Sequence, residues 1–152
     1  MKLVITVWLL CAGLCTAAQA GEPPASFDAA LAEELGADDY GMRRYVMAIL
    51  RAGPNRDHDA DTARALQRGH MEHMQRMAAD GKLVLAGPFL DDGEMRGIFV
   101  FAVETLAEAE ALTAADPAVE SGRLSMELHP WYGSAALMKV GEIHGAVSRT
   151  SF

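Results

Sequence analysis

Residues Thr62–Pro88, TARALQRGHMEHMQRMAADGKLVLAGP, predict a helix, a helix stop and a short strand in direct succession. At about 100° per residue, one helical stripe roughly 60° wide holds Leu66, His70, His73 and Met77. Gly81 follows as a helix stop, because glycine tolerates a left-handed backbone. The apolar run Leu83–Ala86 then predicts a buried strand that Gly87 and Pro88 close. The pattern places a titratable imidazole, that of His70, on the buried face of the helix.

Strand and helix signals flank this stretch on both sides. Tyr45–Leu50 is apolar at every position, which predicts a strand covered on both faces. Gly97–Val103 is rich in β-branched and aromatic residues and predicts another strand. A capping box at Thr105 opens a helix to about Ala115, which Asp116 and Pro117 end.

The last strand is predicted from the alternation of Leu124, Met126 and Leu128 with polar residues, and it ends at His129-Pro130-Trp131. The element order is then β-α-β-β-α-β. This order predicts an α+β, ferredoxin-like domain over residues 42–132, a four-stranded antiparallel sheet with two helices on one face. The apolar side chains on the other sheet face need a second cover, so we expect a homodimer formed through the sheet.

The two ends of the chain carry different signals. Residues 1–20 combine Lys2, an apolar core and Ala18-Gln19-Ala20, which predicts a secretory signal peptide and a periplasmic or secreted protein that begins at Gly21. Cleavage would remove the only two cysteines of the chain. The extension 21–41 is either a tether or a short helix built on Phe27, Leu31 and Leu35 with Ser26 as its cap. The tail 133–152 is typical of an arm or edge segment.

The charge balance excludes some classes of partner. Acidic residues outnumber Lys and Arg by 21 to 13, and the formal net charge is −8. Such a chain repels nucleic acid and anionic membrane surfaces, so we expect neither partner once the signal is cleaved. The sequence contains no phosphate-binding glycine loop and no nucleophile elbow, and we expect no cofactor.

Two groups of residues could in principle bind a metal ion. The loop Asp57–Asp61, DHDAD, has three carboxylates and His58, but it lacks the glycine and distal glutamate of a calcium-binding EF-hand loop. A solvated loop, whose Asp61 caps the next helix, is the better interpretation. His70 and His73 form an H-x-x-H pair that needs a third ligand, from His58 or His129. We expect no metal, and expect His73 to line the pocket beside His70.

The chain resembles the YciI-like, or YCII-related, family of the dimeric α/β-barrel superfamily. The resemblance rests on the order of weak motifs: the Tyr45–Leu50 strand, His70 in RGHMEHM, the stop GKL at Gly81, Ala86-Gly87-Pro88, the Gly97 strand, Asp116-Pro117 and His129-Pro130-Trp131. It implies two subunits whose sheets pair into a barrel, and a His–Asp active-site pair that corresponds here to His70 and Asp116. A dehydrochlorinase acting on a chlorinated hydroxyquinol belongs to this family.

The residues themselves leave alternatives open. Without the resemblance, the better interpretation of His70 is a satisfied core histidine, and Asp116 is equally well interpreted as a turn residue whose carboxylate binds local amides. Three functions remain: a lyase- or isomerase-type enzyme with a His70–Asp116 acid/base pair, a non-catalytic homodimer that binds a small molecule, and a metal- or haem-handling barrel. In each case Gly87 and Pro88 are expected beside the small-molecule pocket.

Overall fold

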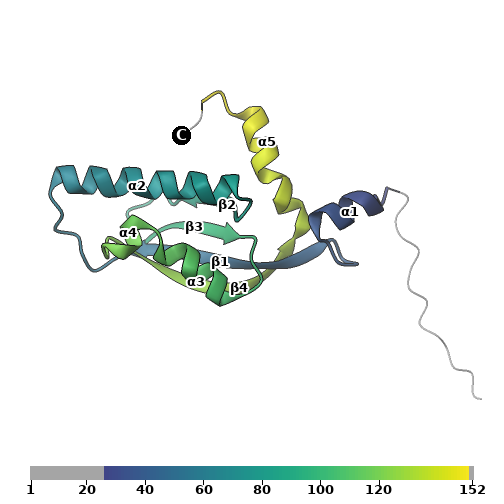
Figure 1. Ribbon diagram of the computed structural model, residues 1–152, viewed down its shortest axis with the longest axis horizontal. Helices are drawn as coiled ribbons and strands as arrows, with labels where there is room; N and C mark the ends of the chain where they lie inside the picture. The colour runs from purple at the N-terminus through teal and green to yellow at the C-terminus, as the bar shows by residue number, and fades with distance from the viewer. Residues whose placement is uncertain (1–25, 151–152) are drawn as a thin grey trace, which may run out of the picture.

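The computed structural model describes residues 26–150 and has the predicted element order (Figure 1). The central elements are β1 (Met42–Ala52), α2 (Ala60–Ala79), β2 (Leu83–Pro88), β3 (Met95–Phe101), α3 (Leu106–Ala114) and β4 (Leu124–Ser134). Short helices are added around them: α1 (Ala29–Leu35), α4 (Pro117–Glu120), the 3-10 helix η1 (Ala135–Lys139) and α5 (Val140–Val147). The predicted signal peptide, residues 1–20, lies outside the described residues. Within residues 26–150, no helix is both long and apolar enough to cross a membrane.

The sheet has the strand order β2-β3-β1-β4, and every neighbouring pair is antiparallel. β1 is central and pairs with β3 on one side and β4 on the other. This order, with a helix after the first and third strands, is the ferredoxin-like arrangement. The α+β fold class predicted from the sequence is therefore confirmed.

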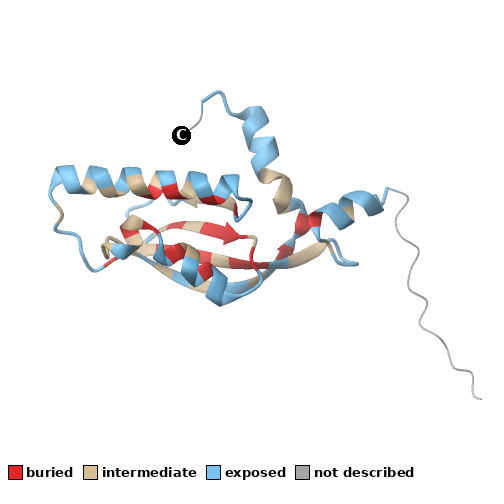
Figure 2. Ribbon diagram, in the orientation of Figure 1, coloured by how far each residue is buried: buried red, intermediate tan, exposed pale blue. Residues whose placement is uncertain are grey.

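Both long helices cover the same face of the sheet. Val46, Ala48 and Phe99 point to this face and form one buried cluster with Met77 of α2 and Ala109 of α3. Figure 2 shows the buried residues gathered on the inner side of α2 and on the central strands. The core therefore lies between the helices and one sheet face.

The opposite sheet face is also apolar. Met47 lies across from Val100, and Ile49 lies across from Ile98. Val100 is buried, whereas the other three side chains are partly exposed. The expectation that both faces of β1 are apolar is met, and the two long helices cover only one of them.

The start of α2 differs from the prediction. Asp59, not Asp61, is the N-cap, because its carboxylate accepts hydrogen bonds from the backbone N–H groups of Asp61 and Thr62, both at 2.9 Å. The helix therefore begins at Ala60. Its end agrees with the prediction, since Gly81 follows it with φ of 68°.

Three strands are longer than predicted. β1 spans Met42–Ala52, where the sequence predicted Tyr45–Leu50. β2 includes Gly87 and Pro88 rather than ending before them, and only Leu83 in it is fully buried because β2 is an edge strand. β4 does not stop at His129-Pro130-Trp131 but continues to Ser134, into the segment predicted as tail, because it pairs with β1 along the whole length of both strands. Pro130 fits in β4 because an edge strand leaves alternate N–H groups unpaired.

Both chain ends form helices that flank the sheet. In the extension, α1 is capped by Asp28 rather than Ser26, and of its apolar residues Leu35 is buried while Phe27 and Leu31 are exposed. The tail is not an edge segment: η1 contacts β1 and β2, and α5, which follows η1 (Figure 1), contacts β2. Among the residues that the structure describes, none before β1 and none after β4 lines the cavity described below.

Candidate active site

His70 lies in the middle of α2 on the face that packs against the sheet. Its side chain is largely buried, with a relative exposure of 7% for the residue. The ring stacks on Phe99 of β3, with ring centroids 5.9 Å apart and an interplanar angle of 15°. Helix periodicity and the apolar sheet together fix the direction of the imidazole.

Asp116 is fully buried and lies between α3 and α4, where its carboxylate has two partners. Oδ1 accepts a hydrogen bond from the backbone N–H of Ala118 at 2.9 Å, which caps α4. Oδ2 lies 2.6 Å from Nδ1 of His70. The local turn role and the histidine pair, which the sequence left as alternatives, are thus both present, one on each oxygen.

Gly69 lets α4 approach α2 closely enough for this contact. A Cβ atom at Gly69 would lie 3.1 Å from Cγ of Pro117, a tighter separation than most side chains tolerate. A glycine inside a helix costs roughly 0.5–1 kcal/mol relative to alanine. The close approach accounts for the glycine, and it brings Asp116 against the next residue of α2, His70.

Electrostatics identify the donor in this pair. Burial raises the pKa of Asp116, but the hydrogen bond from His70, the charge on that ring and the Ala118 amide lower it more, so the pKa lies below its ordinary value. The carboxylate is therefore ionised and can only accept. Nδ1 of His70 carries the hydrogen, which leaves Nε2 with its lone pair when the ring is neutral.

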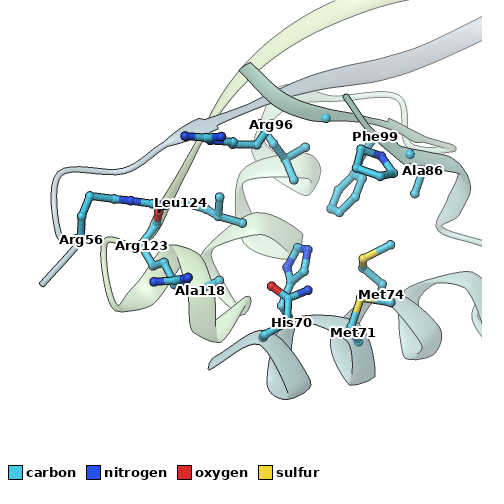
Figure 3. Close-up of a pocket in the computed structure, with 15 residues that line it drawn as sticks. Arg56, His70, Met71, Met74, Ala86, Arg96, Phe99, Ala118, Arg123 and Leu124 are labelled. Atoms are coloured by element: carbon cyan, nitrogen blue, oxygen red, sulfur yellow. Dashed lines mark hydrogen bonds between the residues drawn. The ribbon is translucent and has the colours of Figure 1, made fainter. Parts of the chain in front are cut away.

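A cavity of about 450 Å³ opens beside His70, between α2 and the sheet (Figure 3). This volume falls in the usual range for small-molecule sites. Its apolar wall includes Leu50, Met71, Met74, Phe99 and Leu124. Gly87 and Pro88 also line it, where the sequence placed them, and their binding of a ligand stays a prediction.

Three arginines that the sequence did not single out complete the lining: Arg56, Arg96 and Arg123. Arg56 and Arg123 are held by contact between the loop after β1 and the turn before β4. Nη1 of Arg56 donates to the carbonyl of Arg123 at 3.0 Å, and the Gly53 amide donates to the same carbonyl at 2.9 Å. A Cβ atom at Gly53 would overlap the Gly122 carbonyl at 2.2 Å, so glycine permits this contact. No local pattern signals an arginine cluster built from three separate segments.

His73 lies elsewhere, contrary to the expectation that it lines the pocket. Its Nε2 is 2.8 Å from the carbonyl oxygen of Leu112, to which it must donate. This carbonyl belongs to the last turn of α3, where carbonyl groups lack helical partners. His73 therefore joins α2 to the end of α3 and does not line the cavity.

The possible metal ligands do not come together. Asp59 of the acidic loop caps α2, and His129 lies on exposed β4 beside Glu127, with Nε2 and Oε1 3.1 Å apart. Within residues 26–150, no three His, Cys, Asp or Glu side chains are grouped in a way that could hold a metal ion.

The fold and this site define a ferredoxin-like α+β domain with a buried histidine–aspartate pair at the edge of a cavity. Comparison with known proteins gives the family. The model of the YCII-related domain matches residues 46–132. The chain belongs to the YCII-related family.

Two known proteins are similar to this chain. Uncharacterized protein YjpA of Bacillus subtilis (strain 168) is 32% identical over 91 residues, which is 59% of this chain and 95% of that protein. The solved structure of 5-chloro-2-hydroxyhydroquinone dehydrochlorinase from Burkholderia phenoliruptrix AC1100, in complex with 2,5-dihydroxybenzoquinone, is 19% identical. That match has a TM-score of 0.43 and covers 57% of this chain and 92% of the other.

Proposed function

We propose that this protein is a small-molecule enzyme of the lyase or isomerase type, in which His70 is the general acid/base and Asp116 positions it. One observation carries the proposal: a ring nitrogen of His70 lies 2.6 Å from a buried carboxylate while the same residue lines a cavity of about 450 Å³. A histidine that served packing alone would not need to border a cavity.

The chemistry follows from the two ring nitrogens of His70. Asp116 holds the Nδ1–H tautomer, so Nε2 can take a proton from a ligand carbon or hydroxyl, and the carboxylate stabilises the imidazolium that forms. The electron pair of the broken C–H bond then forms a double bond. In a lyase a leaving group departs with its own electron pair; in an isomerase Nε2 returns the proton to a different carbon.

A non-catalytic homodimer that binds a small molecule is the second candidate. The partly exposed apolar side chains of Met47, Ile49 and Ile98 favour a second subunit on the open sheet face. Size-exclusion chromatography with light scattering at micromolar concentration tests this. A monomeric mass that persists on concentration contradicts the homodimer, but it leaves the acid/base proposal untouched.

Proton NMR in D₂O tests the catalytic proposal. The purified protein is incubated with a panel of small hydroxylated aromatics, keto acids and hydroxy acids, and deuterium exchange or elimination is followed. We expect at least one compound to react with the wild type and not with His70→Gln. The matched control is His129→Gln, because His129 is exposed on β4 and lies outside the cavity.

Either of two results would reject the catalytic proposal. The first is equal turnover by wild type and His70→Gln. The second is binding of a panel compound that depends on pH and on His70, with no turnover of any compound, which would establish the binding protein instead.

Export is a separate proposal, supported by the apolar segment and Ala18-Gln19-Ala20 of residues 1–20. Intact-mass analysis of the periplasmic fraction should give a chain that begins at Gly21. A dominant species that retains Met1 would rule out cleavage at this position.

A further inference from the structure

The charge of the cavity is opposite to that of the chain. Acidic residues outnumber basic ones by 21 to 13 over the whole sequence. The cavity, however, is lined by Arg56, Arg96 and Arg123, and among the described residues that line it none is Asp or Glu. Asp116 lies behind His70 and supplies one negative charge against three positive ones. The cavity is therefore a local positive site in an acidic protein.

The three arginines share one side of this cavity with Leu124 and Ala118, and no described residue of the opposite side is an arginine. Figure 3 shows Arg56, Arg96 and Arg123 along one side, with Ala86, Phe99 and Met74 on the other and His70 between them. A ligand that contacts both sides needs an anionic end and an apolar body. Its centre would then lie against the imidazole.

The arginine side of the cavity has unused hydrogen-bonding capacity. Nε of Arg96 is buried and has no hydrogen-bond partner among the residues that the structure describes. Leaving such a group unpaired is costly, and grouping three guanidinium groups adds repulsion. Two oxygens of a carboxylate or of a phosphate match the guanidinium fork in geometry and charge, so a bound oxyanion would offset both costs.

We propose that the cavity binds a small organic oxyanion, with its carboxylate or phosphate on the three arginines and its apolar body against Phe99 and Met74. This inference rests on the proposed function and names the substrate class of the same site. The arrangement would hold the carbon nearest the anionic group beside Nε2 of His70. A carboxylate next to that carbon acidifies its C–H bond only when the charge is neutralised, which is the role that the arginines would have.

Isothermal titration calorimetry with matched probes tests the proposal without requiring turnover. The probes are benzoate, phenyl phosphate and neutral benzamide, so the two kinds of oxyanion are distinguished from each other and from the uncharged ring. We expect at least one anion to bind the wild type about tenfold or more tightly than benzamide, because hydrogen bonds to charged groups are the stronger kind. Affinity for the anion should fall as salt rises, and affinity for benzamide should not.

Arginine variants locate the site. We expect Arg96→Gln and Arg123→Gln each to weaken binding of the preferred anion by about tenfold, because each removes a charge-assisted hydrogen bond. Arg68→Gln is the matched control, since Arg68 is an exposed arginine of α2 that does not line the cavity. The salt series on wild type needs no variant, so the proposal can be rejected even if a substitution impairs folding.

Three results would overturn the oxyanion proposal: equal affinity for benzamide and both anions, no salt dependence, or an equal loss in Arg68→Gln and Arg96→Gln. Absence of anion binding at millimolar concentration would overturn it as well. None of these results bears on the role of His70. That role is tested by comparing turnover of the wild type with turnover of His70→Gln. Conversely, anion binding that is intact in a protein whose turnover does not depend on His70 would reject the catalytic role and keep the oxyanion site.

Discussion

His70 and His73 lie one turn apart on the same face of α2, and each is 7% exposed. Their partners differ. His70 pairs with a buried carboxylate and borders a cavity, whereas His73 donates to the Leu112 carbonyl at the end of α3. The partners also require opposite neutral tautomers, with the hydrogen on Nδ1 of His70 and on Nε2 of His73.

Burial and helical position are therefore the same for the two histidines, and neither property identifies the functional one. What differs is the group on the neighbouring element that each ring contacts. A carboxylate partner leaves one nitrogen of His70 available to a ligand. A carbonyl at a helix end makes His73 a structural link between α2 and α3.

The largest expected difference is in turnover. With a substrate from the NMR panel, His70→Gln should lower kcat by about 10²–10⁴-fold, the usual contribution of general acid/base catalysis. His73→Gln should retain turnover, because that ring does not reach the cavity. Steady-state kinetics on both variants, with circular dichroism as the folding control, make the comparison. Similar losses in the two variants would end the distinction drawn between the histidines.

Replacing the carboxylate partner should give the larger loss of stability. Asp116→Ala removes the N-cap of α4, worth about 1 kcal/mol, and leaves the Nδ1–H of His70 unpaired at a cost of about 1–3 kcal/mol. Urea unfolding gives the change in free energy. Asp61→Ala is the control: its exposed carboxylate pairs with exposed Arg64 near the start of α2, and changes at such surface sites usually stay within about 0.5 kcal/mol. If both variants lose the same free energy, the buried pair does not stabilise the fold.

His73→Ala should lower the unfolding free energy by less than Asp116→Ala, and its effect should be local to α3. It leaves the Leu112 carbonyl without its donor, at a cost of about 1–3 kcal/mol. Because this bond joins α2 to α3, hydrogen exchange should increase in the last turn of α3. Unchanged exchange there, with unchanged unfolding free energy, would show that water replaces His73 without loss.

The smallest expected difference between variants is in the unfolding free energy that each loses at acid pH. The pKa of Asp116 is lowered in the folded state, despite burial, by His70 and the Ala118 amide. Its contribution to stability is therefore present above the unfolded-state pKa, about 3.9, and is lost as pH falls through the folded-state pKa. Between about pH 5 and pH 2, wild type and His73→Ala should lose unfolding free energy in parallel, and Asp116→Asn should lose less. Parallel curves for wild type and Asp116→Asn would contradict this account.

Local chemistry explains what was predicted correctly. The inward direction of His70 follows from helix periodicity, the stop at Gly81 from its left-handed backbone, and the start of α3 from the Thr105–Glu108 capping box. Each signal lies within a few residues of the feature that it controls. The element order, and with it the ferredoxin-like fold, follows from such signals taken in sequence.

The element boundaries that were predicted wrongly have two physical causes. Neighbouring residues compete for the same cap, and strand length depends on pairing with a strand far away in the chain. Asp59 and Asp61 are both able to cap α2, and in the structure Asp59 has the extended backbone of an N-cap while Asp61 lies inside the helix. β4 extends to Ser134 because β1 offers pairing partners that far, which the alternation in Leu124–Leu128 does not reveal.

The sequence by itself determined that a histidine would lie on the buried face of α2, and the family resemblance named Asp116 as its partner. Only the tertiary structure decided that His73 meets a carbonyl instead of the cavity, and that Arg56, Arg96 and Arg123 converge beside His70. The reason is that periodicity fixes the direction of a side chain from its own helix alone. The group that it meets comes from segments far away in the chain, and an arginine in a loop has the same local pattern whether it faces solvent or a cavity.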